Sequence, residues 1–311
     1  MSHEQPNQIA DIALTAGDYA ANINPCGAGL RALTYQGRSL TETYPVGAKP
    51  PMKTGCVLAP WPNRTADGVF DFRGTLYQLP VNEPARNNAI HGLVFAKDFT
   101  VVEHTTDAVS LTTTVDEPWP WPTTITMRYQ LAAETGLTIT ATATNTGNTA
   151  APYGIGLHTY LNAQGAAVDD CALTMPVQAR IPMDPTRCLP CGPAIPVGED
   201  RLGSFDDRLL RGVWMDYPFH PLTPNEAGEY VYTLHHEGRG VQLICDHNYR
   251  WVQVFTADPD HGQAFPDRGR AVAVEPMTCP PNALRTGEDL IVLEPGATTT
   301  AVCRMVAYER G

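Results

Sequence analysis

One carboxylate is conspicuous in the sequence because of its neighbours. Glu275 follows the apolar run Ala271–Val274 and comes directly before Pro276. A carboxylate rarely enters an apolar core without a partner or a function. Proline has no N–H to give to a neighbouring strand, so we expect this carboxylate to lie where strand pairing stops.

Two histidines are candidates for a site with this carboxylate. His91 lies in the loop sequence Asn88-Ala-Ile-His91-Gly92, and His158 lies in a glycine-rich segment that runs on to Tyr160. In a strand, residues two positions apart share a face, so His158 and Tyr160 would point the same way. Imidazole and carboxylate groups are the usual agents of proton transfer. Taken singly, a histidine is more often a structural residue held by hydrogen bonds than a catalyst.

A third group of polar residues lies near the N-terminal end. Trp61, Asn63 and Arg64 supply an aromatic ring, an amide and a guanidinium within four residues. Arg64 could bind a ligand, or it could fix a loop by pairing with Asp67 or Asp71. Together with the carboxylate and the imidazoles, these residues predict a cofactor-free, aromatic-lined cleft suited to proton transfer on a neutral polyol.

The cysteines do not predict a metal site or a disulfide framework. Eight cysteines in 311 residues are sparse, and Cys188-Leu-Pro-Cys191 has the spacing of a metal half-site with no second half elsewhere. We interpret them as buried or free thiols.

The elements that must position these residues are strands. Proline and glycine are frequent, with 28 and 26 residues, which leaves little room for long helices. Apolar residues alternate with polar ones, often threonine, in many segments. The predicted strands cover 18–23, 30–33, 70–79, 110–115, 124–131, 137–144, 229–234, 241–245, 251–255 and 298–308. This pattern predicts an antiparallel β-sandwich.

No linker or repeat divides the chain, so we expect a single domain over residues 1–311, with residues 1–7 disordered. The irregular segments 44–55, 81–96, 182–203 and 257–270 are long for loops, and loops of that length are often functional.

Charge and hydropathy exclude several classes of function. The formal net charge is −12, and Lys49, Lys53 and Lys97 are the only lysines, which argues against a nucleic-acid binder. No apolar run approaches the roughly 20 residues that span a bilayer. The first residues have neither a basic end nor an apolar core, so we expect no signal peptide and a cytoplasmic protein.

Six motifs in a fixed order resemble those of the aldose 1-epimerase (mutarotase) family, over nearly the whole chain. They are Pro62-Asn63-Arg64 with Gly68 to Leu79 and Asn82; Asn88-Ala-Ile-His91-Gly92; Asn145-Thr-Gly147 leading to Gly154-Ile-Gly156-Leu-His158-Thr-Tyr160; Trp214-Met-Asp216-Tyr-Pro-Phe219; Val252-Gln253-Val-Phe255-Thr; and Val274-Glu275-Pro276-Met-Thr-Cys279-Pro-Pro-Asn282-Ala. The chain departs from many relatives at Thr159, where they carry proline or serine.

The resemblance implies a large antiparallel β-supersandwich with few short helices and a sugar cleft, and it implies no cofactor and no metal. It implies that Glu275 is the general base on the anomeric hydroxyl and His158 the general acid on the ring oxygen. Substrate-binding roles are implied for Asn63, Arg64, His91, Asp216 and Gln253, although Asp206 or Asp207 could replace Asp216. Trp61 and Tyr160 could offer apolar ring faces to a pyranose.

The chemistry of such a reaction needs one base and one acid. We expect the carboxylate to be ionised and the imidazole protonated, because attraction between the opposite charges would raise the pKa of the histidine. The expected partner is a small-molecule sugar, an aldohexose, acted on by a monomer or homodimer with no nucleic acid or membrane involved.

Three alternatives remain open from the sequence. A glycoside hydrolase needs two carboxylates, and Asp206, Asp207 or Asp216 could join Glu275. A non-catalytic sugar-binding protein could use the same fold, although it would need neither an acid nor a base. A mutarotase for a sulfonated or phosphorylated sugar would need extra cations; the candidates are Arg86, Arg180, Arg187, Arg268 and Arg270, unless they simply pair with surface acids.

Overall fold

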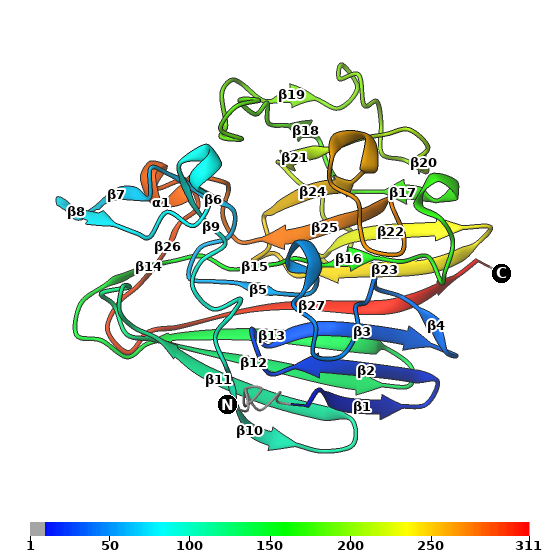
Figure 1. Ribbon diagram of the computed structural model, residues 1–311, viewed down its shortest axis with the longest axis horizontal. Helices are drawn as coiled ribbons and strands as arrows, with labels where there is room; N and C mark the ends of the chain where they lie inside the picture. The colour runs from blue at the N-terminus through cyan, green and yellow to red at the C-terminus, as the bar shows by residue number, and fades with distance from the viewer. Residues whose placement is uncertain (1–9, 311) are drawn as a thin grey trace, which may run out of the picture.

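The computed structural model describes residues 10–310 and consists almost entirely of antiparallel strands (Figure 1). The expected disorder of residues 1–7 lies outside the described residues. No helix within residues 10–310 has the length and apolar character needed to cross a membrane.

A nine-stranded sheet forms the larger layer, in the order β10-β11-β12-β13-β27-β23-β22-β17-β20. Its strands are β10 (Thr100–His104), β11 (Ala108–Val115), β12 (Thr123–Ala132), β13 (Gly136–Asn145), β17 (Ala172–Thr174), β20 (Arg208–Leu209), β22 (Tyr230–His236), β23 (Arg239–Cys245) and β27 (Thr298–Glu309). Burial alternates strictly along β12, as the threonine-apolar alternation predicts. Threonine hydroxyls pair across the solvent face, with Thr144 and Thr298 2.9 Å apart between their hydroxyl oxygens.

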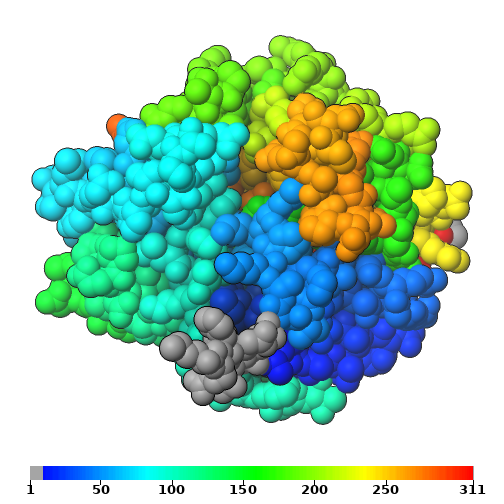
Figure 2. Space-filling view, viewed as in Figure 1, coloured from blue at the N-terminus to red at the C-terminus, as the bar shows by residue number. Residues whose placement is uncertain are grey.

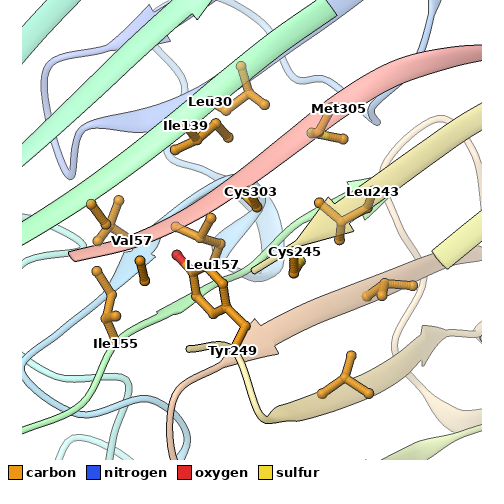
Figure 3. Close-up of a cluster of buried hydrophobic side chains, with 14 of the residues drawn as sticks. Leu30, Val57, Ile139, Ile155, Leu157, Leu243, Cys245, Tyr249, Cys303 and Met305 are labelled. Carbon is orange, nitrogen blue, oxygen red and sulfur yellow. The ribbon is translucent and has the colours of Figure 1, made fainter. Parts of the chain in front are cut away.

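A second sheet carries the residues of interest, in the order β19-β18-β21-β24-β25-β15-β5, with β16 also paired to β25. Its strands are β5 (Val57–Leu58), β15 (Gly156–Leu157), β16 (Tyr160–Leu161), β18 (Ala179–Arg180), β19 (Ile195–Pro196), β21 (Asp216–Phe219), β24 (Trp251–Ala257) and β25 (Ala271–Met277). Apolar side chains from both sheets meet between them, among them Ile139 and Met305 from one and Val57 and Leu157 from the other (Figure 3).

The remaining elements are short. A four-stranded sheet contains β1 (Ile12–Ala16), β2 (Tyr19–Asn24), β3 (Gly29–Tyr35) and β4 (Arg38–Ser39), and strand pairs are formed by β6 (Arg64–Ala66) with β9 (Asn88–Ile90), β7 (Val69–Phe72) with β8 (Thr75–Gln78), and β14 (Ala151–Tyr153) with β26 (Ile291–Leu293). The helical turns are η1 (Pro51–Lys53), η2 (Pro84–Arg86), η3 (Val168–Asp170), η4 (Pro259–His261) and α1 (Ala283–Thr286). The all-β prediction with few short helices is therefore confirmed.

Two details differ from the sequence interpretation. The predicted strand over 70–79 is a hairpin, because the chain turns at Arg73 and Gly74, which both have positive φ. Strand pairing also continues through Glu275, which lies opposite Gln253 in β24. The expected stop in pairing occurs only on the other edge of β25.

That edge explains how a strand can contain Pro276. The partner strand is interrupted between Leu157 and Tyr160, so β25 has no continuous neighbour at this point. A proline without an N–H is tolerated where the neighbour is missing. The interruption contains His158, and the fold thereby brings the histidine opposite the glutamate.

Strands from both halves of the chain share the nine-stranded sheet, as β13 pairs with β27 along eight residues. This pairing joins a strand from the middle of the described chain to its last strand in one sheet. We keep a single domain as our proposal.

Candidate active site

A polar cleft of about 210 Å³ brings together seven of the nine residues predicted for the site. They are Asn63, Arg64, His91, His158, Asp216, Gln253 and Glu275. Figure 2 shows a hollow on this face, where the η1 segment, the β6–β9 segment and the loop around η4 meet. Of these elements, η1, β9 and η4 lie within three of the four long loops that the sequence singled out.

Glu275 and His158 form the centre of the cleft. The Oε1 atom of Glu275 lies 3.5 Å from Nε2 of His158, and their side chains are 2% and 7% exposed. Glu275 Oε2 and His158 Nδ1 have no hydrogen-bond partner within residues 10–310. Buried polar atoms are normally paired, so an unpaired acid and an unpaired base facing one cleft indicate groups kept available for a ligand.

The backbone holds His158 from both sides. Its N–H donates to the carbonyl of Cys56 at 3.0 Å, and its carbonyl accepts from the N–H of Gly55 at 2.8 Å. The ring of Tyr160 stacks on the imidazole with centroids 5.3 Å apart and planes tilted by 17°. The imidazole is thus fixed in orientation before any substrate binds.

Burial sets the protonation of this pair. Removal from water lowers the pKa of His158 from 6.5 to about 3 and raises the pKa of Glu275 well above 4.5, with Asp216 adding to the rise. The prediction of a raised imidazole pKa is therefore wrong. Burial favours the uncharged form of each group, a protonated Glu275 beside a neutral His158.

Three polar side chains continue from the glutamate across the sheet. Gln253 donates from Nε2 to Oδ1 of Asp216 at 2.7 Å, and Asn63 donates from Nδ2 to the side-chain Oε1 of Gln253 at 3.3 Å. Burial raises the pKa of Asp216, and the charges of Arg64 and Arg86 oppose that rise. The result is a row of fixed donors and acceptors beside the acid/base pair.

Arg64 enters the cleft as part of a buried ion pair. Its Nε and Nη2 atoms lie 2.9 and 3.0 Å from the two carboxylate oxygens of Glu83. Burial alone would raise the pKa of Glu83, but the hydrogen bonds and charge of Arg64 outweigh it and lower that pKa. Glu83 also accepts from Asn88 Nδ2 at 2.9 Å. This bidentate pair replaces the pairing with Asp67 or Asp71 that the sequence left open, and it fixes the guanidinium plane.

The three aromatic and imidazole residues predicted to bind sugar have different positions. His91 lines the cleft, with its ring centroid 5.5 Å from that of His158, and burial lowers its pKa well below 6.5. Tyr160 is 1% exposed and lies behind His158, where it also packs on Phe265.

Trp61 is part of the hydrophobic core and packs against Trp119 at a centroid distance of 5.6 Å. Neither Trp61 nor Tyr160 lines the cleft, so their placement gives no support to the ring-stacking role expected for them.

The remaining lining residues were not anticipated. They are Met52, Lys53, Phe255 and Gln263. Met52 and Lys53 have φ angles of 46° and 62°, the left-handed region that non-glycine residues seldom adopt, and this turn directs the segment over the cleft. Burial lowers the pKa of Lys53, and no carboxylate of residues 10–310 is among the groups that shift it. The ammonium instead lies 3.5 Å from the centroid of the Phe95 ring.

The arginines considered for an anionic substrate have other partners. Arg86, Arg180, Arg187 and Arg268 pair with Glu83, Asp200, Asp67 and Glu42, and Arg270 pairs with Asp169 and Asp258. None of them lines the cleft. Asp206 is exposed, and Asp207 lies 2.6 Å from His235 on the other sheet. Asp216 is therefore the aspartate that the fold brings to Glu275.

The arrangement can exchange protons with a polyhydroxylated ligand. One acid/base pair faces the cleft, and a guanidinium, two amides, an imidazole and a carboxylate surround it. Groups of this kind donate to and accept from hydroxyls in fixed directions.

Comparison with known proteins identifies the family of the chain. The family model for aldose 1-epimerase matches residues 11–306. The protein YihR of Escherichia coli (strain K12), whose own function is uncharacterised, is 35% identical over 291 residues, which cover 92% of this chain and 89% of YihR.

Solved structures show the same fold. A homologue of GalM/aldose epimerase from C. elegans superposes with a TM-score of 0.84 at 18% identity, covering 97% of this chain and all of that one. Galactose 1-epimerase from Lactobacillus acidophilus NCFM superposes with a TM-score of 0.77 at 18% identity, covering all of this chain and 98% of that one. The chain therefore belongs to the aldose 1-epimerase family and is an isomerase that acts on carbohydrates.

Proposed function

We propose that the protein interconverts the α and β anomers of a free aldose by opening and reclosing the sugar ring, with Glu275 and His158 as its acid/base pair. The observation that carries the proposal is the buried contact of 3.5 Å between these two side chains, each with a further unpaired polar atom, at the centre of a polar cleft.

The reaction moves two protons and leaves the enzyme unchanged. One group removes the proton from the C1 hydroxyl while the other delivers a proton to the ring oxygen, and the C1–O5 bond breaks to give the open aldehyde. Rotation about C1–C2 presents the other face of the carbonyl, and the reverse proton transfers close the ring as the opposite anomer. Groups of this kind contribute rate factors of about 10² to 10⁴.

The ligand-free charge state is compatible with both directions of transfer. A protonated Glu275 beside a neutral His158 carries the same number of protons as a carboxylate beside an imidazolium. Transfer of one proton from Glu275 to His158 gives the form with Glu275 as base and His158 as acid. Hydroxyl donors of a bound sugar and the nearby charge of Arg64 favour the carboxylate and thus that form.

The surrounding residues position the sugar. Arg64, Asn63 and His91 lie on the β6–β9 side of the cleft, and Gln253 and Asp216 lie along the sheet. Because Glu83 and Gln253 already hold Arg64 and Asp216 in place, little side-chain entropy is lost when a sugar binds.

The wild-type protein should speed the equilibration of freshly dissolved α-glucose or α-galactose, which polarimetry follows directly. We expect a rate proportional to enzyme concentration and well above that of buffer alone. Chromogenic glycosides serve as the counter-test, because their hydrolysis without faster mutarotation would identify a glycoside hydrolase. A protein that binds sugars but leaves the equilibration rate unchanged would be a sugar-binding protein.

The pH dependence should reflect the shifted pKa values. The active pair holds one proton, so activity falls when His158 takes a second proton and when Glu275 loses its own. The first event lies well below 6.5, because the pKa of His158 is about 3, and the second lies well above 4.5. The measurement is kcat/KM from about pH 4 to about pH 9, after the rate in buffer alone has been subtracted. We expect kcat/KM not to fall near pH 6.5, the ordinary pKa of histidine, as the pH is lowered. An acid limb at or above 6.5 would contradict this assignment.

A sugar with a sulfonate or phosphate group is the second candidate substrate. The observation that favours it is Lys53, which lines the cleft and whose pKa is shifted by no carboxylate of the described chain. Glucose 6-phosphate in the same polarimetric panel separates the two. If Lys53→Met abolishes activity on the phosphorylated sugar and spares glucose, the anionic group binds at Lys53.

A further inference from the structure

Arg187 joins the irregular segment 182–203 to the strand pair β6–β9. Its Nη2 atom donates to Oδ1 of Asp67, just after β6, at 2.9 Å, and to Oδ1 of Asn88, the first residue of β9, at 3.2 Å. The guanidinium also donates to two backbone carbonyls of the turn before β9, at 3.1 and 2.8 Å, those of Arg86 and Asn87. One side chain therefore binds the end of β6 and the start of β9, although it lies 99 residues from Asn88 in the sequence.

Asp184 shapes the turn that presents Arg187. Its carboxylate accepts from the backbone N–H groups of Thr186 and Arg187 at 2.9 and 2.6 Å, and its carbonyl accepts from the N–H of Cys188 at 2.8 Å. An aspartate that accepts from the backbone N–H two residues on is a common way to fix a turn. The backbone carbonyl of Arg187 in turn accepts from Nδ2 of Asn88 at 2.9 Å. Arg187 thus meets the Asn88 amide with both a donor and an acceptor.

These two contacts set the direction of the Asn88 amide. A guanidinium can only donate, so it binds the amide oxygen, and a backbone carbonyl can only accept, so it binds an N–H. Nδ2 of Asn88 also donates to Oε2 of Glu83 at 2.9 Å. Asn88 is fully buried, and the pKa of Glu83 is low, so an amide turned the other way would bring its oxygen against a charged carboxylate.

Glu83 connects the Asn88 amide to the guanidinium in the cleft. Its Oε2 atom accepts from Nδ2 of Asn88 and also from Nε of Arg64, both at 2.9 Å. Arg64 is opposite Ile90, and residues two apart on a strand point the same way, so Arg64 and Asn88 leave the strand pair on one face. The side chain of Arg187 is 35% exposed and that of Arg64 is 10% exposed, so these contacts run from the surface into the cleft.

We propose that Arg187 is a positioning residue for the substrate, which acts through Asn88 and Glu83 to hold Arg64 in the direction in which it binds the sugar. This inference rests on the proposed function, in which Arg64 binds sugar hydroxyls. It gives a role to the segment 182–203, although no residue of that segment lines the active-site cleft. Loss of Arg187 should weaken sugar binding and leave proton transfer by the acid/base pair on the other strands unchanged.

The test is Arg187→Met, which keeps the apolar stem and removes the guanidinium. Polarimetry with glucose and galactose should show a KM between about threefold and about thirtyfold above that of the wild type, and a kcat within about twofold. An unchanged KM would overturn the proposal, as would a loss in kcat alone.

Arg285→Met is the matched control. Within residues 10–310, the Arg285 guanidinium donates to Oδ2 of Asp67 at 2.9 Å and to the carbonyl of Ala66 at 3.2 Å, and to neither Asn88 nor Glu83. Both variants lose one ion pair with Asp67, so a general loss of stability would affect both. We expect the KM of Arg285→Met to stay within about twofold of the wild-type value. An equal rise in KM for both variants would overturn the proposed route.

The route itself is tested by adding Arg187→Met to Asn88→Ala. If Arg187 acts through Asn88, the KM of the double variant should lie within about twofold of that of Asn88→Ala alone, whereas losses that multiply would overturn the route. If melting shows that Asn88→Ala does not fold, Glu83→Gln takes its place with the same expectation.

A wild type that turns over no sugar would contradict the mutarotase proposal rather than the positioning role. Titration calorimetry with glucose and galactose then compares Arg187→Met with Arg285→Met. Weaker sugar binding by Arg187→Met alone supports the positioning role, and equal binding by the two variants overturns it.

Discussion

Glu275→Gln should abolish mutarotation while leaving the fold and sugar binding intact. The amide has the shape of the carboxyl group but cannot take or give the proton, so we expect kcat to fall by about 10³-fold or more and KM to change by less than about threefold. Polarimetry of freshly dissolved α-glucose measures the rate, and calorimetry with glucose measures binding. A variant that keeps more than about a tenth of the wild-type kcat would remove Glu275 from the chemistry.

The melting temperature provides the control for this variant. A folding defect would lower it, whereas the loss of the Glu275 carboxyl group is expected to leave it unchanged or raise it. The folded protein raises the pKa of Glu275 above 4.5, so this group stabilises the fold at low pH and its contribution is lost as the pH rises. Glutamine has no proton to lose. We therefore expect the variant to melt at the same temperature as the wild type at low pH, and at the same or a higher temperature above neutral pH. Glu237→Gln, at a side chain that is 85% exposed, should change neither activity nor melting.

The strands could be predicted from the sequence where one face is exposed to solvent and the other is buried. β12 and β13 fall within one residue of their predicted bounds, because threonine and apolar residues alternate without interruption. The strands of the site are different. β25 is buried along its whole length, and β15 and β16 contain only two residues each. Such short or fully buried segments show no alternation of apolar and polar residues. The sequence therefore cannot show that His158 lies where the strand that neighbours β25 is interrupted beside Glu275.

Only those residues of the candidate site that belong to a recognisable sequence motif could be predicted. Glu83 lies 19 residues from Arg64, and the pairing of β6 with β9 closes that distance, for which no local pattern exists. Trp61 is close to Arg64 in the sequence, which suggests that both side chains line the cleft. However, Asn63 has a φ of 53°, and the chain turns there, so the indole enters the core while the guanidinium enters the cleft.

Protonation is the property that the sequence predicted least well. Proximity of a carboxylate and an imidazole suggests an ion pair, because opposite charges attract. The two side chains are only 2% and 7% exposed, and burial disfavours the charged form of each, which lowers the pKa of His158 and raises that of Glu275. Burial is a property of the assembled sheets, and no window of sequence around Glu275 or His158 reports it.

His158→Ala should lower kcat by about 10²- to 10⁴-fold, because the ring oxygen then has no partner for proton transfer. The truncated side chain leaves space beside Tyr160, which stacks on the imidazole in the wild type. Added imidazole should enter that space and restore part of the rate. Rescue that rises with imidazole concentration and then saturates distinguishes a lost acid from a damaged fold, which imidazole cannot repair.

The double variant of His158 and Glu275 tests whether the two side chains act as one unit. If one proton is shared by the pair, removal of either group disables both proton transfers. The kcat of the double variant His158→Ala, Glu275→Gln should then lie within about threefold of the kcat of the slower single variant. Independent groups would instead multiply their losses to about 10⁵-fold or more. Multiplying losses would contradict a shared proton, and they would mean that each side chain exchanges protons with solvent separately. The contact of 3.5 Å favours a shared proton instead, because it holds the two side chains next to each other.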